Sequence, residues 1–263
     1  MKYETIIYEK ANNIARITLN RPEVLNAINR QMESVELPQA VFDASRDEDV
    51  RVLIITGAGR GFCAGGDHKF LMEVREQRST GGVEARGGIH DVILELRRMG
   101  KPTIAMVNGP AAGAGFGLAL ACDMRIGSEN ARFRVAFTII GLTPVDGSVW
   151  MLPRIVGISN ACRIIFTGDV VGAEEAHRIG ILDKLVPAEK LEAETMALAR
   201  RLAQGPPIAI GYDKMMIYKG LDIDLETHLS YTGLSERVSM ASEDFMEGIK
   251  AFAEKRQPVF RGK

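Results

Sequence analysis

The sequence predicts an α/β fold in its first half and a helical region in its second half. Short apolar runs, several of them ending in glycine, alternate with longer segments of helical period, and after about residue 160 only amphipathic helical segments remain. Alternation of this kind is typical of a sheet whose strands are joined by crossover helices. No low-complexity linker separates the halves, so we expect a core over residues 1–200 and a helical C-terminal region over residues 201–263.

Four strands and two helices are predicted in the first half. Residues 5–9 and 14–20 are apolar runs joined by a Lys-Ala-Asn-Asn turn, which favours a hairpin. Residues 52–57 and 102–109 are almost wholly apolar and end in glycine, as strands buried on both faces do. Residues 29–45 and 88–100 have a helical period, and Pro38 predicts a kink or a break in the first of them.

The second half is predicted to be a succession of amphipathic helices. These lie over residues 173–181, 188–205, 207–221, 225–240 and 242–260, and Gly and Pro separate them. Their apolar faces can pack on the core or on another subunit, and the pattern does not choose between these two arrangements.

Composition indicates an ordinary globular protein. The chain has 263 residues, of which 46% are hydrophobic and 25% charged, and its net charge of −1 gives no electrostatic reason to expect nucleic acid or an anionic membrane as a partner. No stretch reaches about 18 uninterrupted apolar residues. Cys63, Cys122 and Cys162 are widely spaced and odd in number, which favours reduced thiols and a cytoplasmic location over disulfides or a metal site.

Two glycine-rich segments each follow a predicted buried strand. They are residues 56–70, TGAGRGFCAGGDHKF, and residues 107–123, VNGPAAGAGFGLALACD. Glycine lets the backbone approach a ligand closely, and a turn that leads into a helix leaves N–H groups unpaired at the positive end of the helix dipole. Two such turns can direct two donors at one oxygen, as an oxyanion hole does. Tight turns and close helix packing explain the same glycines without any ligand. A dinucleotide site is disfavoured because the glycine spacing differs from that motif.

The chain resembles the crotonase, or enoyl-CoA hydratase/isomerase, superfamily. The resemblance is carried by ITLNRPEVLNAI (residues 17–28), GRGFCAGGDHKF (59–70), KPTIAMVNGPAAGAGFGLALACDMRIGSENARF (101–133) and EGIKAFAEKRQPVF (247–260), in matching order and spacing. It implies a spiral of ββα units with a C-terminal helical trimerisation region, and a homo-oligomer that is a trimer or a hexamer. It also implies an acyl-CoA substrate, with no cofactor beyond the coenzyme A of that thioester.

The resemblance also assigns the site. It places the thioester oxygen between the backbone N–H groups of Gly66 and Ala114. It implies that the backbone around Ala64, Asp67 and His68, together with the segment that ends at Ala27, lines the coenzyme A. Lys255 is a weaker candidate for approaching the coenzyme A phosphates from a neighbouring subunit. Phe137 and Trp150 are candidates for an apolar acyl pocket, and ordinary core packing explains them equally well.

Both glutamates used by hydratases of the family are missing. The matching positions hold Gly117 and Phe137, neither of which can carry a proton. Asp146 is the remaining candidate acid or base. Catalytic carboxylates of several relatives come from this segment: isomerases have theirs at the position of Val145, and β-diketone hydrolases at the position of Asp146 itself. Asp followed by Gly-Ser-Val is also a favoured helix cap, which is the structural alternative.

Two histidines are further candidates. By spacing, His90 matches a catalytic histidine of the halobenzoyl-CoA dehalogenases, and an imidazole that titrates near neutral pH can act as a base. A histidine on a helix surface is also commonplace. His68 follows the glycine-rich turn and can face the substrate, whereas its neighbour Asp67 is predicted mainly to cap the next helix. Cys63 has no partner base in the sequence and is expected to be core filler.

The predicted function is therefore enolate chemistry on an acyl-CoA, with Asp146 moving a proton. One acid/base group suits a double-bond isomerase best, and hydration with a water held in some other way is the nearest variant. The alternatives are a hydrolase of thioester, C–C or C–halogen bonds that uses Asp146 with or without His90, and a non-catalytic protein that only binds acyl-CoA.

Overall fold

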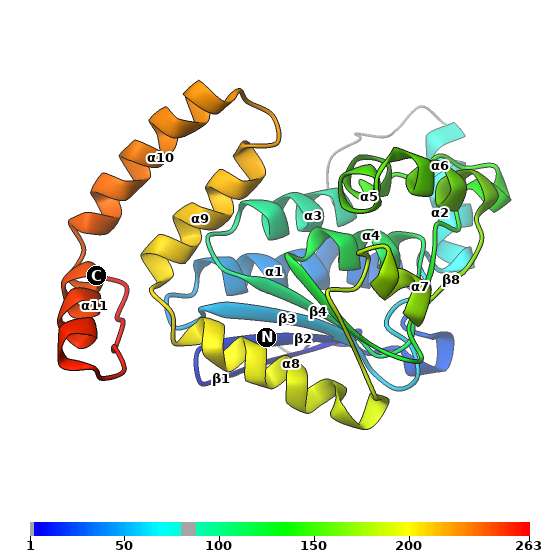
Figure 1. Ribbon diagram of the computed structural model, residues 1–263. Coiled ribbons are helices and arrows are strands. Elements are labelled where there is room, and N and C mark those ends of the chain that lie inside the picture. The colour runs from blue at the N-terminus through cyan, green and yellow to red at the C-terminus, as the bar shows by residue number, and fades with distance from the viewer. Residues whose placement is uncertain (1–2, 80–87) are drawn as a thin grey trace.

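The computed structural model describes residues 3–79 and 88–263, and it is built around a mixed sheet (Figure 1). The strand order of this sheet is β1-β2-β3-β4-β6-β9. The strands are β1 (Ile6–Ala11), β2 (Ile14–Leu19), β3 (Val52–Gly57), β4 (Thr103–Val107), β6 (Met124–Ser128) and β9 (Lys184–Val186). The first two form the expected antiparallel hairpin, and all later pairs are parallel. Strands β3 and β4 are buried along their whole length, as their uninterrupted apolar runs predict.

Helices cover both faces of the sheet. The α-helices of the described residues, in chain order, are α1 (Leu37–Arg46), α2 (His68–Ser79), α3 (Ile89–Arg98), α4 (Ala114–Ala121), α5 (Ser148–Val156), α6 (Ile158–Thr167), α7 (Ala173–Arg178), α8 (Ala188–Ala203), α9 (Pro207–Lys219), α10 (Leu225–Met240) and α11 (Glu243–Glu254). Helices α1, α3 and α4 share the larger apolar core on one face, and α8 closes the other face (Figure 1). The chain is helical without a break from residue 30 to residue 46, and Pro38 lies in the first turn of α1 directly after a π-helical segment, Met32–Glu36, so the expected kink or break takes the form of a π-helical turn.

A second, three-stranded sheet lies beside the start of α4. It consists of β5 (Pro110–Ala112), β7 (Arg132–Arg134) and β8 (Val171–Gly172). The expectation that only helices follow residue 160 was wrong at two places, β8 and β9. These strands have two and three residues, too few to show an apolar pattern, and they exist because β7 and β6 offer edges to pair with.

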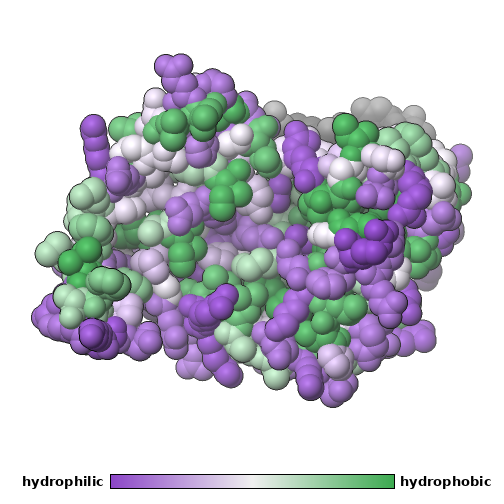
Figure 2. Space-filling view, viewed as in Figure 1, coloured by the Kyte–Doolittle hydropathy of each residue, from purple (hydrophilic) through white to green (hydrophobic). Residues whose placement is uncertain are grey.

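The last three helices form an arm that reaches away from the sheet (Figure 1). Helix α9 is anchored to the core, whereas α10 has no buried residue. Large apolar side chains of α10 and α11 are exposed, among them Leu225, Leu229, Leu234, Met246 and Phe252. Apolar surface gathers over this arm in Figure 2, and again over the region of α5 and α6. No helix of the described residues is both long and apolar enough to cross a membrane.

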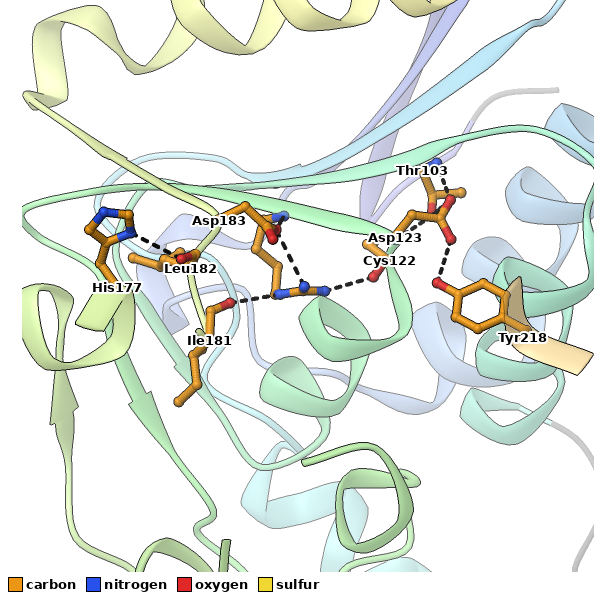
Figure 3. A network of polar contacts seen from close by, with 9 residues as sticks. Thr103, Cys122, Asp123, His177, Ile181, Leu182, Asp183 and Tyr218 are labelled. Atoms are coloured by element: carbon orange, nitrogen blue, oxygen red, sulfur yellow. Dashed lines mark hydrogen bonds and ion pairs between the residues drawn. The ribbon is translucent and has the colours of Figure 1, made fainter. Parts of the chain in front are cut away.

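A polar network fixes α9 to the core (Figure 3). The Lys214 ammonium lies 2.8 Å from Asp123 Oδ2 and donates to the carbonyls of Leu96 and Lys101. The Tyr218 hydroxyl donates to Asp123 Oδ1 at 2.6 Å, and Thr103 donates to the same carboxylate through its N–H and its hydroxyl. Since both oxygens of the partly buried Asp123 carboxylate are paired, the network satisfies the charge that Lys214 of α9 brings to the core.

Candidate active site

The two glycine-rich turns touch one another. The first follows β3, the second connects β5 to α4, and a bridge pairs Cys63 with Ala111. A Cβ atom on Gly115 would lie 2.3 Å from the Cys63 carbonyl oxygen, and one on Gly65 would lie 2.8 Å from the Ala112 carbonyl oxygen. Neither distance leaves room for a side chain, so glycine at these two positions allows the backbones to approach.

Each of these turns carries an unpaired backbone donor. Within the described residues, the N–H groups of Gly66 and Ala114 have no hydrogen-bond partner. On either side of Gly66, the Gly65 carbonyl accepts from the Ile28 N–H and the Asp67 N–H donates to the Ile28 carbonyl, so the Gly66 N–H is left out of this pairing. Ala114 is the first residue of α4, where N–H groups have no partner within the helix. The structure thus leaves free donors at both residues predicted for the oxyanion hole. Their convergence on a single substrate oxygen remains a prediction.

Asn26 fixes the first turn, and sequence reasoning missed it. It has a left-handed backbone with φ of 58° and is fully buried. Its amide nitrogen donates to the carbonyls of Ala58, Gly61 and Phe62, which ties residues 21–27 to the turn. The sequence signal that could have indicated this role is the asparagine itself, because asparagine in a loop adopts a left-handed backbone more readily than most residues.

Asp146 lies against the first turn of α4. Its side chain is 1% exposed, and a Cβ atom on Gly117 would lie 2.5 Å from its Cγ and from its Oδ2. Gly117 is one helical turn from Ala114, so the carboxyl stands next to the candidate oxyanion donor. The other oxygen, Oδ1, accepts from the Ser148 N–H at 3.1 Å and from the Ser148 hydroxyl at 2.6 Å. The N-cap residue of α5 is Gly147 and no side chain caps this helix, so the predicted capping role of Asp146 was wrong: its Oδ1 bonds Ser148, the first residue of α5, and Oδ2 faces α4.

Burial raises the pKa of the Asp146 carboxyl above its ordinary value. Hydrogen bonds from Ser148 and from the backbone of Asp146 and Gly117 oppose this shift without cancelling it. A raised pKa makes the carboxylate a stronger base, and it brings the pKa of the carboxyl closer to the pH at which the protein works. Both properties suit a group that takes and returns a proton.

The structure brings His90 to the same loop. His90 lies in the first turn of α3, and its Nε2 is 2.6 Å from the carbonyl oxygen of Val145, the residue before Asp146. A histidine and a carboxylate distant in sequence thus meet at one loop, as the sequence predicts for candidate partners. The hydrogen bond joins His90 to the backbone of Val145 and not to the Asp146 carboxyl.

The two aromatic candidates lie in different surroundings. Phe137 is buried, and its ring lies 3.7 Å from where a Cβ atom on Gly113 would stand, directly behind the turn that precedes Ala114. Trp150 is 40% exposed, and its ring packs against the guanidinium groups of Arg97 and Arg154. Phe137 therefore borders the candidate site. A role for either residue in an acyl pocket remains a prediction.

The residues predicted to line coenzyme A surround the first turn. Asp67 Oδ1 accepts from the Lys69 N–H at the start of α2, which confirms the predicted cap, and Oδ2 pairs with Arg21 at 3.0 Å. His68 is exposed at the first residue of α2. Arg21 also donates to the carbonyl of Ala27, so a single guanidinium joins two of the predicted coenzyme A segments.

The other candidates are placed as follows. The Ala64 N–H donates to the Leu25 carbonyl, so this part of the turn pairs with the segment that ends at Ala27. Cys63 and Cys122 are fully buried, and all three cysteines are free thiols. Lys255 is exposed at the C-terminal end of α11, in the arm. Residues 3–79 and 88–263 contain no group of three or more His, Cys, Asp or Glu side chains that could hold a metal ion.

Comparison with known proteins identifies the family of the chain. The enoyl-CoA hydratase/isomerase family model matches residues 9–263. A probable enoyl-CoA hydratase of Mycobacterium tuberculosis is 43% identical over 254 residues, covering 94% of this chain and 89% of the relative. The 1,2-epoxyphenylacetyl-CoA isomerase of Escherichia coli is 37% identical over 265 residues, covering 99% of each chain.

Solved structures give the same result. An enoyl-CoA hydratase from Bacillus anthracis superposes with a TM-score of 0.91 at 31% identity, covering 99% of this chain and all of the other. A family-model match over nearly the whole chain and relatives above 30% identity at near-complete coverage agree with one another. The fold is therefore the crotonase fold, and the chain belongs to the enoyl-CoA hydratase/isomerase family.

Proposed function

We propose that this protein is an acyl-CoA isomerase that moves a double bond through a thioester enolate, with Asp146 as its single acid/base group. The observation that carries the proposal is the contact between Asp146 and Gly117. In this chain Gly117 stands where hydratases of the family have a glutamate, and the buried Asp146 carboxyl fills the space that a side chain there would need.

The proposed reaction needs only one proton carrier. On a 3-enoyl-CoA, Asp146 takes a proton from the α-carbon; the C–H electron pair passes into the thioester and forms a dienolate. The N–H groups of Gly66 and Ala114 stabilise the negative oxygen, a contribution of about 3–4 kcal/mol for each donor in comparable sites. The protonated Asp146 then returns the proton to the γ-carbon, and a 2-enoyl-CoA results. Atoms and charge balance without a cofactor.

Relatives support isomerisation and leave hydration as the second candidate. The E. coli relative is named an isomerase acting on a CoA ester, and a Streptococcus mutans relative at 33% identity is named trans-2-decenoyl-[acyl-carrier-protein] isomerase. A Syntrophomonas wolfei relative at 36% identity is named crotonyl-CoA hydratase. Hydration needs a group that activates water as well as one that protonates the α-carbon, and Asp146 alone supplies one of these at a time.

The remaining parts of the proposal follow from the family. Ala27, Ala64, Asp67 and His68 line the coenzyme A, Phe137 and Trp150 border the acyl group, and no further cofactor takes part. The exposed apolar faces of α10 and α11 serve a trimer or hexamer of identical chains in the cytoplasm.

A panel of substrates tests the proposal. 3-Enoyl-, 2-enoyl-, dienoyl-, aryl- and β-keto-acyl-CoA esters are incubated with the protein, and the products are identified by mass spectrometry and NMR. We expect conversion of 3-enoyl- to 2-enoyl-CoA, with turnover reduced about 10²- to 10⁴-fold in Asp146→Asn. Release of free coenzyme A or halide would instead identify a hydrolase, and binding of every ester without turnover would identify a non-catalytic protein.

A further inference from the structure

The loop that carries Asp146 has few backbone restraints of its own. It runs from Gly141 to Gly147, which both have left-handed backbones with φ of 71° and 72°. In the described part of the chain, the contact with His90 is the one hydrogen bond recorded to the backbone of residues 143–145. Ser148 bonds the Asp146 carboxyl itself, and the backbone before Asp146 depends on contacts from outside the loop.

Helix α3 supplies these contacts from consecutive turns. His90 bonds the Val145 carbonyl, and three residues further along the helix a methyl group of Ile93 lies 3.8 Å from where a Cβ atom on Gly147 would stand. Residues three apart on a helix lie on one face. One face of α3, which holds His90 and Ile93, therefore contacts the loop at Val145 and at Gly147, on either side of Asp146.

The chemistry of this contact fixes the role of Nε2. A carbonyl oxygen can only accept a hydrogen bond, so His90 Nε2 must carry a proton and donate it to Val145. A nitrogen that already holds its proton in this bond cannot take one from a substrate. Nδ1 is the remaining nitrogen, and the geometry gives it no recorded protein partner in the described residues.

We infer that His90 is a positioning residue, which donates through Nε2 to the Val145 carbonyl and so holds the Asp146 carboxyl against the start of α4. This inference rests on the proposed role of Asp146 and extends it. It assigns His90 a structural task, and it excludes Nε2 from the base role that the position suggests by resemblance. The inference requires that the side chain at residue 90 places an N–H donor at the position that Nε2 occupies.

Glutamine and alanine at residue 90 separate the two roles. The terminal amide of Gln can place an N–H donor near the position of Nε2 and cannot act as a base, whereas Ala offers no donor. We expect H90Q to keep a turnover number close to that of the unaltered protein with the same pH–rate profile. H90A should lower kcat about 10- to 100-fold with little change in KM, because misplacing a reacting group by about 1 Å has effects of this size.

The double variant shows whether His90 acts through Asp146. If it does, H90A lowers turnover in the native background and adds nothing in the D146N background. All assays use the panel ester that turns over fastest. Arg98→Ala, an exposed change on the same helix, is the matched control, and thermal unfolding of each variant checks that it is folded.

Crystal structures of the variants test the inference without an activity measurement. Crystal structures of H90A and H90Q should show residues 143–146 displaced in the first and in their native place in the second. The inference is overturned if H90Q is as inactive as H90A and loses a limb of the pH profile, or if H90A leaves the loop and kcat unchanged. Full turnover in D146N would overturn the proposed function alone, since the loop displacement in H90A would still be measurable.

Discussion

The carboxyl of Asp146 and the missing side chain of Gly117 occupy the same space. A Cβ atom at residue 117 would lie 2.5 Å from three atoms of Asp146, and the carboxyl is 1% exposed. A glutamate at position 117 is therefore incompatible with Asp146 where it stands. Glycine at residue 117 and the buried carboxyl of Asp146 therefore form one packing arrangement, in which the carboxyl reaches α4 from the loop before α5.

Alanine at residue 117 should damage both stability and turnover. The added methyl group must push the Asp146 carboxyl away from α4 or shift the helix, and overpacking of this kind costs about 1–3 kcal/mol. We expect G117A to lower the free energy of unfolding by that amount and to reduce kcat together with it. Urea unfolding and steady-state kinetics measure the two effects.

Gly172→Ala is the matched control for this change. Gly172 has an ordinary φ of −74°, and a Cβ atom there would meet nothing within 4 Å. Its stability and kcat should stay near those of the unaltered protein. Equal behaviour of the two alanine variants would contradict the packing conflict at Gly117.

Replacing Asp146 by asparagine should make the protein relatively more stable as pH rises. Burial raises the pKa of Asp146 in the folded state, so folding favours its neutral form. Its contribution to stability is complete below the unfolded pKa and is lost as pH rises through the folded pKa. The stability of D146N relative to the unaltered protein should therefore increase from acidic to neutral pH, measured by urea unfolding at each pH.

For Asp67→Asn, the relative stability should change with pH in the opposite direction. A hydrogen bond from Arg21 lowers the pKa of Asp67, so its stabilising effect is present above the unfolded pKa and is lost as pH falls through the folded one. D67N should lose relative stability from acidic to neutral pH. Parallel trends in the two variants would show that the burial of Asp146 does not control its titration.

Breaking the anchor of α9 should loosen the C-terminal arm. Lys214 and Asp123 form a pair whose side chains are 7% and 15% exposed, and removing one partner of such a pair costs about 3–5 kcal/mol. We expect Lys214→Met to lower stability by an amount toward the lower end of this range, because Thr103 and Tyr218 still bond the carboxylate. Lys219→Met, an exposed change on the same helix, should have little effect.

Limited proteolysis locates this loosening. Cleavage after α8 should accelerate in K214M and not in K219M at equal protein concentration. If unfolding and cleavage rates match between the two variants, the network around Asp123 does not hold the arm.

Thiol reactivity should divide the cysteines into two classes. Cys63 and Cys122 are fully buried, and burial raises the pKa of each thiol to about 12. Because the thiolate is the reactive form, both should resist a thiol reagent in the folded protein, whereas the partly exposed Cys162 should react. Mass spectrometry after labelling at pH 8 identifies the modified residue, and rapid labelling of Cys63 would contradict its expected role as core filler.

Local patterns were enough to predict the elements that depend on neighbouring residues. The apolar runs that became β3 and β4, the β1–β2 hairpin and the cap at Asp67 each follow from a few consecutive side chains. The helices of the arm were also predicted. What covers their exposed faces was not, because an amphipathic pattern states that a face is apolar and does not name its partner.

Contacts between distant segments could not be predicted from the sequence. Three contacts join elements that only the folded chain brings together: the bond from His90 to Val145, the bonds from Asn26 to three carbonyls, and the packing of Arg97 on the Trp150 ring. The strands β8 and β9 belong to the same class, since their pairing partners define them.

The sequence by itself determined the scaffold, because glycine at residues 65, 113 and 115 and the buried apolar strands constrain the backbone locally. It also determined that residue 117 is a glycine, which carries no acid. Only the tertiary structure decided that the Asp146 carboxyl packs against Gly117, because a loop from elsewhere in the chain closes this space. The contact between Asp146 and Gly117 depends on how two distant segments pack, and a local sequence pattern carries no information about such packing.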